Sequence, residues 1–170
     1  MVERTEPRTD GDELTVLAGF LDYYRATLLM KANGLTDDQA RTPSCPPSPL
    51  NLMGLVRHMA DVERSWFRRG FVGESDETAA ALFYTEAEPD LDMLPPPQAT
   101  LAEAVAALEN EIAVARAIVA DSSLDDVARG ERRGERFNMR WILVHMIEEY
   151  ARHCGHADLL REAIDGVVGD

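Results

Sequence analysis

Hydrophobic residues along most of this chain recur every three or four positions, which is the spacing of one face of an α-helix. Four stretches show the pattern, and they span residues 12–34, 48–70, 100–120 and 141–162. The last stretch, WILVHMIEEYARHCGHADLLRE, contains no proline and a single glycine. Nothing between these stretches shows the alternation that is typical of a strand. The pattern therefore predicts four amphipathic helices.

Capping signals indicate where three helical segments begin. Thr100 is followed three residues later by Glu103, which is the spacing of a capping box. Ser48-Pro49 offers an N-cap followed by a proline at the first helical position. Thr36–Gln39 has the sequence of a second capping box and predicts a short helical turn after the first helix.

The connections between the helices are unequal in length. Residues 1–10 are polar and are expected to be extended, and residues 121–136 form a polar loop. Residues 70–99 are rich in proline and lack a sustained period, so we expect a crossover that forms one wall of a pocket. Together these features predict an all-α fold, a four-helix bundle with long crossover connections in which residues 1–170 form a single domain.

Composition narrows the classes of partner. The formal net charge of -14 disfavours nucleic acid and anionic membrane surfaces, because both are polyanions that proteins usually meet with a basic face. The two cysteines, Cys45 and Cys154, form no CxxC motif and no disulfide framework. The N-terminal stretch has no apolar core of a secretory signal, and no run is long enough for a membrane span. We therefore expect a cytoplasmic protein that acts on a small molecule.

Three of the four histidines lie in the last predicted helix. At roughly 100° per residue, His145, Glu149, His153 and His156 fall on one stripe of that helix. Imidazole and carboxylate groups are the usual ligands of zinc, nickel, iron and manganese, and residues four apart can hold one ion together. The alternative is an ordinary polar helix face.

The remaining histidine, His58, lies beside the apolar stripe of the second helix. On its own it would be read as a histidine at the edge of the core. Together with the cluster in the last helix, it becomes the natural third ligand of a metal ion.

Two segments, LVRHMADVERSWF (residues 55–67) and HMIEEYARHCGHADLLRE (residues 145–162), resemble the DinB-like superfamily of four-helix metalloenzymes, and in particular its actinobacterial branch. The resemblance implies that His58, Glu149 and His153 bind a divalent ion, zinc or nickel. Most relatives have histidine at the position of Glu149, whereas the related mycothiol-dependent maleylpyruvate isomerases have glutamate there. His145 and His156 share the stripe and stay alternative ligands.

The resemblance also implies an activity, a thiol-dependent S-transferase or isomerase that acts on a small electrophile with a low-molecular-weight thiol as co-substrate. Metal-dependent hydrolysis with the same residues stays open. So do a non-catalytic bundle that binds a metal or small molecule, and a structural or dimerisation module. A homodimer is compatible with such a bundle, although no stretch identifies its interface.

Other polar residues near the two motifs have less specific interpretations. Glu63 and Glu148 could accept hydrogen bonds from the ligand imidazoles or replace a ligand. Arg57 and Arg152 could bind a substrate carboxylate, as could Arg161, which is also spaced to pair with Asp158. The large aromatic side chains of Trp66, Phe67, Trp141 and Tyr150 are expected in the core. Cys154 is expected to be a buried, unreactive thiol.

Overall fold

A computed structural model describes residues 4–168 of the chain, and the regular structure in that range is helical. The long helices are α1 (Glu13–Ala32), α3 (Leu52–Glu63), α4 (Leu101–Ala120) and α5 (Met139–Asp165), with a short helix α2 (Asp37–Arg41) and a π-helical segment η1 (Arg64–Val72) that continues α3. Over the same range β-pairing is limited to two isolated bridges. The predicted all-α four-helix bundle is confirmed.

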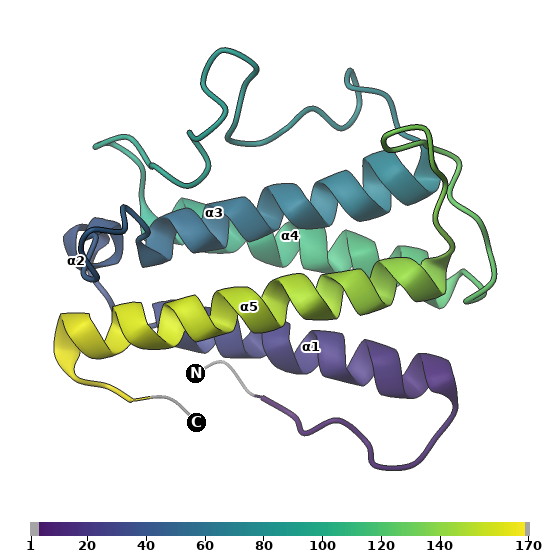
Figure 1. The fold of residues 1–170 in the computed structure, drawn as a ribbon, viewed down its shortest axis with the longest axis horizontal. Helices are drawn as coiled ribbons and strands as arrows, with labels where there is room; N and C mark the ends of the chain where they lie inside the picture. The colour runs from purple at the N-terminus through teal and green to yellow at the C-terminus, as the bar shows by residue number, and fades with distance from the viewer. Residues whose placement is uncertain (1–3, 169–170) are drawn as a thin grey trace.

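The four long helices pack as two pairs, α1 on α5 and α3 on α4 (Figure 1). Helices α3 and α4 run in the same direction, so residues 73–100 travel back along the bundle before α4 begins (Figure 1). This segment is called the crossover below. Residues 121–138 instead join neighbouring ends of α4 and α5 at one end of the bundle (Figure 1), so the second long connection does not cross it.

The capping boxes lie where the sequence predicts them. The side chains of Thr36 and Thr100 each accept a hydrogen bond from the amide three residues later, and in both boxes the third residue's side chain accepts from the cap's own amide. The predicted N-cap Ser48 is wrong. Asn51 caps α3 instead, because its side chain accepts from the Gly54 amide at 2.8 Å and donates to the carbonyl of Met93 in the crossover at 3.1 Å.

Helix α5 extends beyond the predicted residues 141–162 at both ends. Asn138 caps its start by accepting a hydrogen bond from the Trp141 amide at 2.9 Å. Gly166 ends it with a φ of 76°, a left-handed conformation that glycine adopts without strain. Helix α5 therefore runs the length of the bundle, as Figure 1 shows, and carries its polar stripe past several neighbours.

The core lies between the four long helices and contains three of the four aromatic residues expected there. Trp66, Phe67 and Tyr150 are buried, whereas Trp141 is 43% exposed and lies at the surface of α5. Most other large side chains that are almost fully buried are apolar, and they include Leu21, Leu28, Leu52, Met53, Leu55, Met59, Leu108, Met139, Ile142 and Leu143.

The π-helical segment η1 widens the end of α3. Its wider turn places Ser65, Trp66 and Arg69 on the wall of a surface cavity, and such segments are frequent at functional sites. The segment ends at Gly73, whose φ is 79°. Within residues 4–168, no helix combines the length and the apolar character that crossing a membrane requires.

Candidate metal centre

Helices α3 and α5 bring together the three residues expected to bind a metal. His58 from α3 and Glu149 and His153 from α5 each offer one ligand atom, and these atoms all lie within 4.8 Å of one another. His153 Nε2 lies 3.7 Å from Glu149 Oε2, and the rings of His58 and His153 are 5.0 Å apart between centroids. The sequence alone could not establish this convergence, because it depends on how α3 packs against α5.

The crossover supplies a residue that the sequence analysis missed. Asp92 Oδ2 lies 2.8 Å from His58 Nδ1. Burial raises the pKa of Asp92, but hydrogen bonds from His58 and from the Met93 amide outweigh it, and the net pKa lies below the ordinary value. An ionised Asp92 accepts a hydrogen bond from the N–H group at Nδ1 of His58. The lone pair of the imidazole is therefore on Nε2. No local sequence signal marks Asp92, which is one acid among several in the crossover.

A stripe of α3 residues holds the crossover in place beside His58. A Cβ on Gly54 would lie 2.1 Å from the Met93 carbonyl oxygen, so only glycine permits this approach. The carboxylate of Asp61 accepts hydrogen bonds from the amides of Leu82 and Phe83 at 2.6 and 3.0 Å. These contacts follow the helical spacing and fix the position of Asp92.

Arg57 belongs to the same stripe. Its guanidinium donates to the carbonyls of Asp92 at 3.2 Å and Leu91 at 2.8 Å, and it covers the ring of Phe83 at 4.0 Å from the centroid. The side chain is buried beneath the crossover. The structure therefore places Arg57 as a support of the crossover, and its role in substrate binding stays a prediction.

His153 is the most buried of the three candidate ligands. Burial, with smaller contributions from His58, His156 and Arg152, lowers its pKa to about 4, so the imidazole is neutral at pH 7 and has a lone pair for a metal. Its Nδ1 lies 3.3 Å from Nδ1 of His156. His156 thus contacts the outer side of His153, which fits a hydrogen-bonding partner better than a replacement ligand.

His145 lies on the opposite side of Glu149. Its Nε2 is 3.4 Å from Glu149 Oε1, and its ring packs on Trp66 and Trp141 at 4.5 and 5.0 Å between centroids. Burial lowers its pKa as well. His145, Glu148 and Glu149 form a second group with ligand atoms within 4.8 Å of one another, so the structure retains His145 as the alternative ligand that the sequence left open.

Glu63 does not reach the histidines. Its carboxylate accepts from the Arg25 guanidinium at 2.7 Å for each oxygen, and from the Tyr150 hydroxyl at 2.8 Å. All three side chains are buried. Glu63 is therefore half of a buried ion pair between α1 and α3, and its role beside the ligand imidazoles stays a prediction.

Glu148, Asp158 and Arg161 of α5 each pair with another charged residue. Glu148 pairs with Arg152, whose side chain is 63% exposed. The expected pair of Asp158 and Arg161 is wrong, since Asp158 pairs with Lys31 at 2.8 Å and Arg161 with Asp165 at 2.9 Å. The first pair joins α5 to α1, the second lies within α5, and neither lies at the metal centre.

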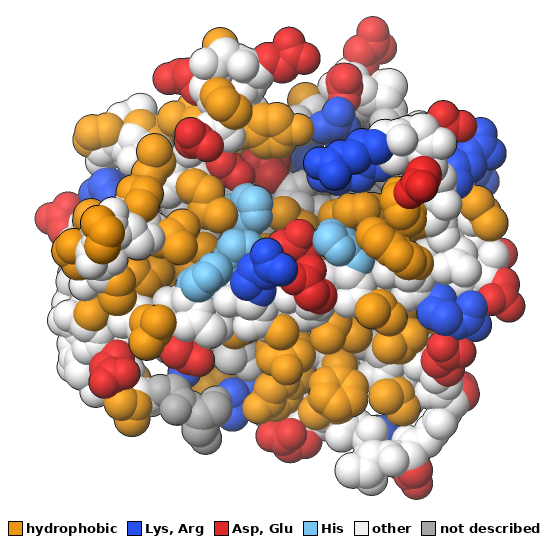
Figure 2. Space-filling model, viewed as in Figure 1, with side chains coloured by type: hydrophobic (Ala, Val, Ile, Leu, Met, Phe, Trp, Pro, Cys, Tyr) orange, Lys and Arg blue, Asp and Glu red, His pale blue; other side chains and the backbone are white. Residues whose placement is uncertain are grey.

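The candidate centre opens into a cavity of about 320 Å³. Residues of α3, η1, α5 and the crossover line it, including His58, Glu149, Trp66, Tyr84, Pro89 and Asp92. Figure 2 shows the histidine side chains, in pale blue, across the middle of this face below the crossover. The expectation that the crossover forms one wall of the pocket is confirmed, and a ligand can reach His58 and Glu149 from solvent.

The chain is similar to known proteins in sequence and in fold. The family model described as Mycothiol-S-transferase matches residues 16–166, which is nearly the whole chain and includes every residue of the candidate centre. This match and the helical fold confirm the DinB-like resemblance that the sequence showed. No curated protein matches the chain significantly.

Among solved structures, the chain is similar to one described as a conserved protein of locus from Enterococcus faecalis. The TM-score is 0.60 at 19% sequence identity, and the alignment covers 93% of this chain and all of the other. This likeness concerns the fold.

Proposed function

The chain belongs to the Mycothiol-S-transferase family, and from that premise we propose that it is a divalent-metal-dependent enzyme that transfers a low-molecular-weight thiol to a small electrophile. The observation that carries the proposal is the convergence of His58, Glu149 and His153 beside an open cavity that His58 and Glu149 line. Three protein ligands with access for a further one are characteristic of catalytic metal sites, whereas structural sites are closed by four.

The residues present fit a divalent ion. Two neutral imidazoles and one carboxylate are a donor set that suits zinc or nickel. The low pKa of His153 keeps that ring unprotonated, and Asp92 directs the lone pair of His58 to Nε2. The carboxylate of Glu149 supplies the one negative charge among the ligands.

The bound metal would lower the pKa of a coordinated thiol and so supply the reactive thiolate at neutral pH. The protein's own residues would hold and orient the reactants. Asp92 fixes the ring of His58, and the crossover with Trp66 shields one side of the cavity from water. In the transfer itself the sulfur bonds to the electrophilic carbon, the leaving group departs with its electron pair, and the thiol proton passes to solvent.

Metal analysis of protein without an affinity tag tests the proposed centre. We expect about one zinc or nickel ion per chain in the wild type and loss of most of it in His58→Ala, Glu149→Ala and His153→Ala. Glu162→Ala, which changes an exposed acid of the same helix, is the matched control and should retain the ion. Loss of metal in His145→Ala but not in His153→Ala would instead assign the alternative set of ligands, and a wild type that takes up neither ion would refute the proposal.

Activity is tested separately on the metal-loaded protein. Consumption of mycothiol with an electrophile such as a benzyl halide should depend on the metal and disappear in His58→Ala. Turnover that proceeds equally well without the thiol would indicate metal-dependent hydrolysis. Full metal occupancy with no turnover of either kind would indicate a protein that binds a metal without catalysing a reaction.

A further inference from the structure

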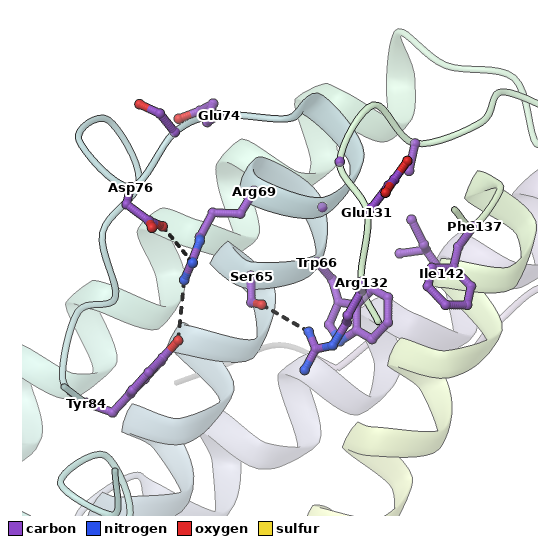
Figure 3. A pocket seen from close by; sticks show the side chains of 14 residues that line it. Ser65, Trp66, Arg69, Glu74, Asp76, Tyr84, Glu131, Arg132, Phe137 and Ile142 are labelled. Atoms are coloured by element: carbon purple, nitrogen blue, oxygen red, sulfur yellow. Dashed lines mark hydrogen bonds and ion pairs between the residues drawn. The ribbon is translucent and has the colours of Figure 1, made fainter. Parts of the chain in front are cut away.

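A second cavity adjoins the candidate metal centre. It has a volume of about 430 Å³ and shares the residues Ser65, Trp66, Tyr84 and Arg132 with the cavity above the metal ligands. Figure 3 shows Arg132 between Ser65 and the ring of Trp66, at the wall common to both cavities. A ligand that extends from the candidate metal centre into the second cavity would therefore pass this guanidinium.

The backbone fixes the loop that carries Arg132. The amides of Arg129 and Gly130 donate to the carbonyls of Phe71 and Gly70 in η1, both at 2.9 Å. A Cβ on Gly130 would lie 2.6 Å from the Arg69 carbonyl oxygen, so this close contact requires glycine. The loop is thus docked on the π-helical segment, and Arg132 follows the docked residues by two positions.

The guanidinium of Arg132 is held without a carboxylate partner. It donates to the Ser65 hydroxyl at 3.1 Å and lies 4.6 Å from the centroid of Trp66. Within residues 4–168 the ion pairs do not include Arg132, and the three acids that line the second cavity are each paired with another arginine. These pairs are Glu74 with Arg68, Asp76 with Arg69 and Glu131 with Arg136.

An unpaired cation matters in this chain, because its formal net charge is -14 and its overall field repels anions. A serine hydroxyl and an aromatic face orient the guanidinium but leave most of its N–H groups for a planar acceptor such as a carboxylate. Both neighbours lie in η1, so the orientation depends on the π-helical turn.

We propose that Arg132 recognises a carboxylate on the electrophile, and that the substrates are therefore small electrophilic acids. This inference rests on the proposed function for the identity of the reaction. The reactive carbon would lie toward His58, Glu149 and His153, and the carboxylate would lie at the wall between the two cavities. The carboxylate takes no part in bond exchange, so Arg132 acts in specificity.

Binding of unreactive analogues tests the inference without any turnover. The quenching of tryptophan fluorescence, measured on the metal-loaded protein, reports binding of 4-methylbenzoate and of 4-methylbenzamide, which differ only in charge and hydrogen bonding. We expect the acid to bind about tenfold more tightly than the amide, and Arg132→Gln to abolish that preference. Arg133→Gln is the matched control, since Arg133 is an exposed arginine of the same loop that lines neither cavity.

The reactive counterparts, 4-(chloromethyl)benzoate and 4-(chloromethyl)benzamide, extend the test to kinetics with mycothiol. The sulfur displaces chloride, which leaves with the bonding electrons, and the thiol proton passes to buffer. We expect Arg132→Gln to lower kcat/KM about tenfold for the acid and to leave the amide unchanged.

The two proposals fail in distinguishable ways. Selective binding of the acid with no thiol transfer would refute the proposed function and leave the anion site at Arg132 intact. Thiol transfer with equal binding of acid and amide would refute the role of Arg132, and so would an acid preference that survives in Arg132→Gln.

Discussion

His58 and Asp92 are 34 positions apart in the chain, yet their side chains meet at 2.8 Å between Nδ1 and Oδ2. One belongs to a helix of the bundle and the other to the crossover. The contact assigns the proton of the imidazole to Nδ1 and its lone pair to Nε2. A loop thereby determines which nitrogen of a helical residue is available to a metal.

Replacing Asp92 by asparagine should weaken metal binding while the protein stays folded. The variant removes the charged partner that orients the His58 ring, and loss of such a partner typically lowers metal affinity about 10- to 100-fold. Competition with a chromophoric chelator measures the affinity for zinc. Asp90→Asn, an exposed acid of the same segment, should bind zinc like the wild type. Equal affinities in both variants would contradict the role of Asp92.

Two glycine-to-alanine variants should shift stability in opposite directions. Gly54→Ala places a methyl group against the Met93 carbonyl, 2.1 Å away in the present arrangement, and should destabilise the fold by about 2 kcal/mol. Gly155→Ala in α5 meets nothing within 4 Å and should stabilise it by about 0.5 to 1 kcal/mol. Urea unfolding with a common m-value measures both differences.

Glu63→Gln should destabilise the fold without affecting the metal. The variant leaves the buried Arg25 guanidinium with the partly exposed Asp22 as its one remaining carboxylate partner, which costs about 3 kcal/mol. The free energy of unfolding and the metal content of the refolded protein are the two readouts. If the variant lost its metal while its stability stayed unchanged, Glu63 would be a residue of the metal centre and this prediction would be wrong.

The metal-free protein should lose stability as the pH falls from about 6.5 to 4. In the folded state burial holds the pKa of His153 at about 4, against an ordinary value of 6.5, so between these values only the unfolded state binds the proton. The contribution of His153 to the free energy of unfolding, relative to its value below pH 4, is fully present above pH 6.5 and amounts to about 3 kcal/mol. His145, with its pKa lowered in the same direction, adds to the effect.

Urea unfolding at several pH values, after treatment with a chelator, measures this dependence. His153→Gln should show a shallower loss of stability between pH 6.5 and 4 than the wild type. Parallel curves for the two proteins would show that His153 is not protonated differently in the folded and unfolded states.

Sequence periodicity was sufficient for the bundle because each long helix has an apolar stripe and most have a recognisable cap. Sequence patterns gave the wrong N-cap for α3, because a tertiary contact determines which residue caps this helix. Asn51 bonds both its own helix and Met93 of the crossover, whereas Ser48 and Pro49 satisfy only the local rule. The π-helical form of η1 likewise has no signal in the hydrophobic period.

The candidate centre was predictable only as far as single helices determine it. The spacing of Glu149 and His153 follows from helical geometry, and the pairing with His58 came from a family resemblance. Asp92 and Arg132 could not be found in this way, because each reaches the centre from an irregular segment. Their positions depend on contacts such as those of Gly54 and Gly130 with distant carbonyl groups.

Cys154 directly follows His153 in the chain but faces the other way, with its thiol 3.5 Å from the Tyr24 carbonyl of α1. Burial raises the pKa of this thiol to about 12, so almost none of it is thiolate at neutral pH. An enzyme with the proposed thiol-transferase activity would risk alkylation by its own electrophilic substrates. The thiol of Cys154, although next to a candidate ligand in sequence, is unreactive at neutral pH. An electrophile in the cavity would therefore react with the incoming thiol.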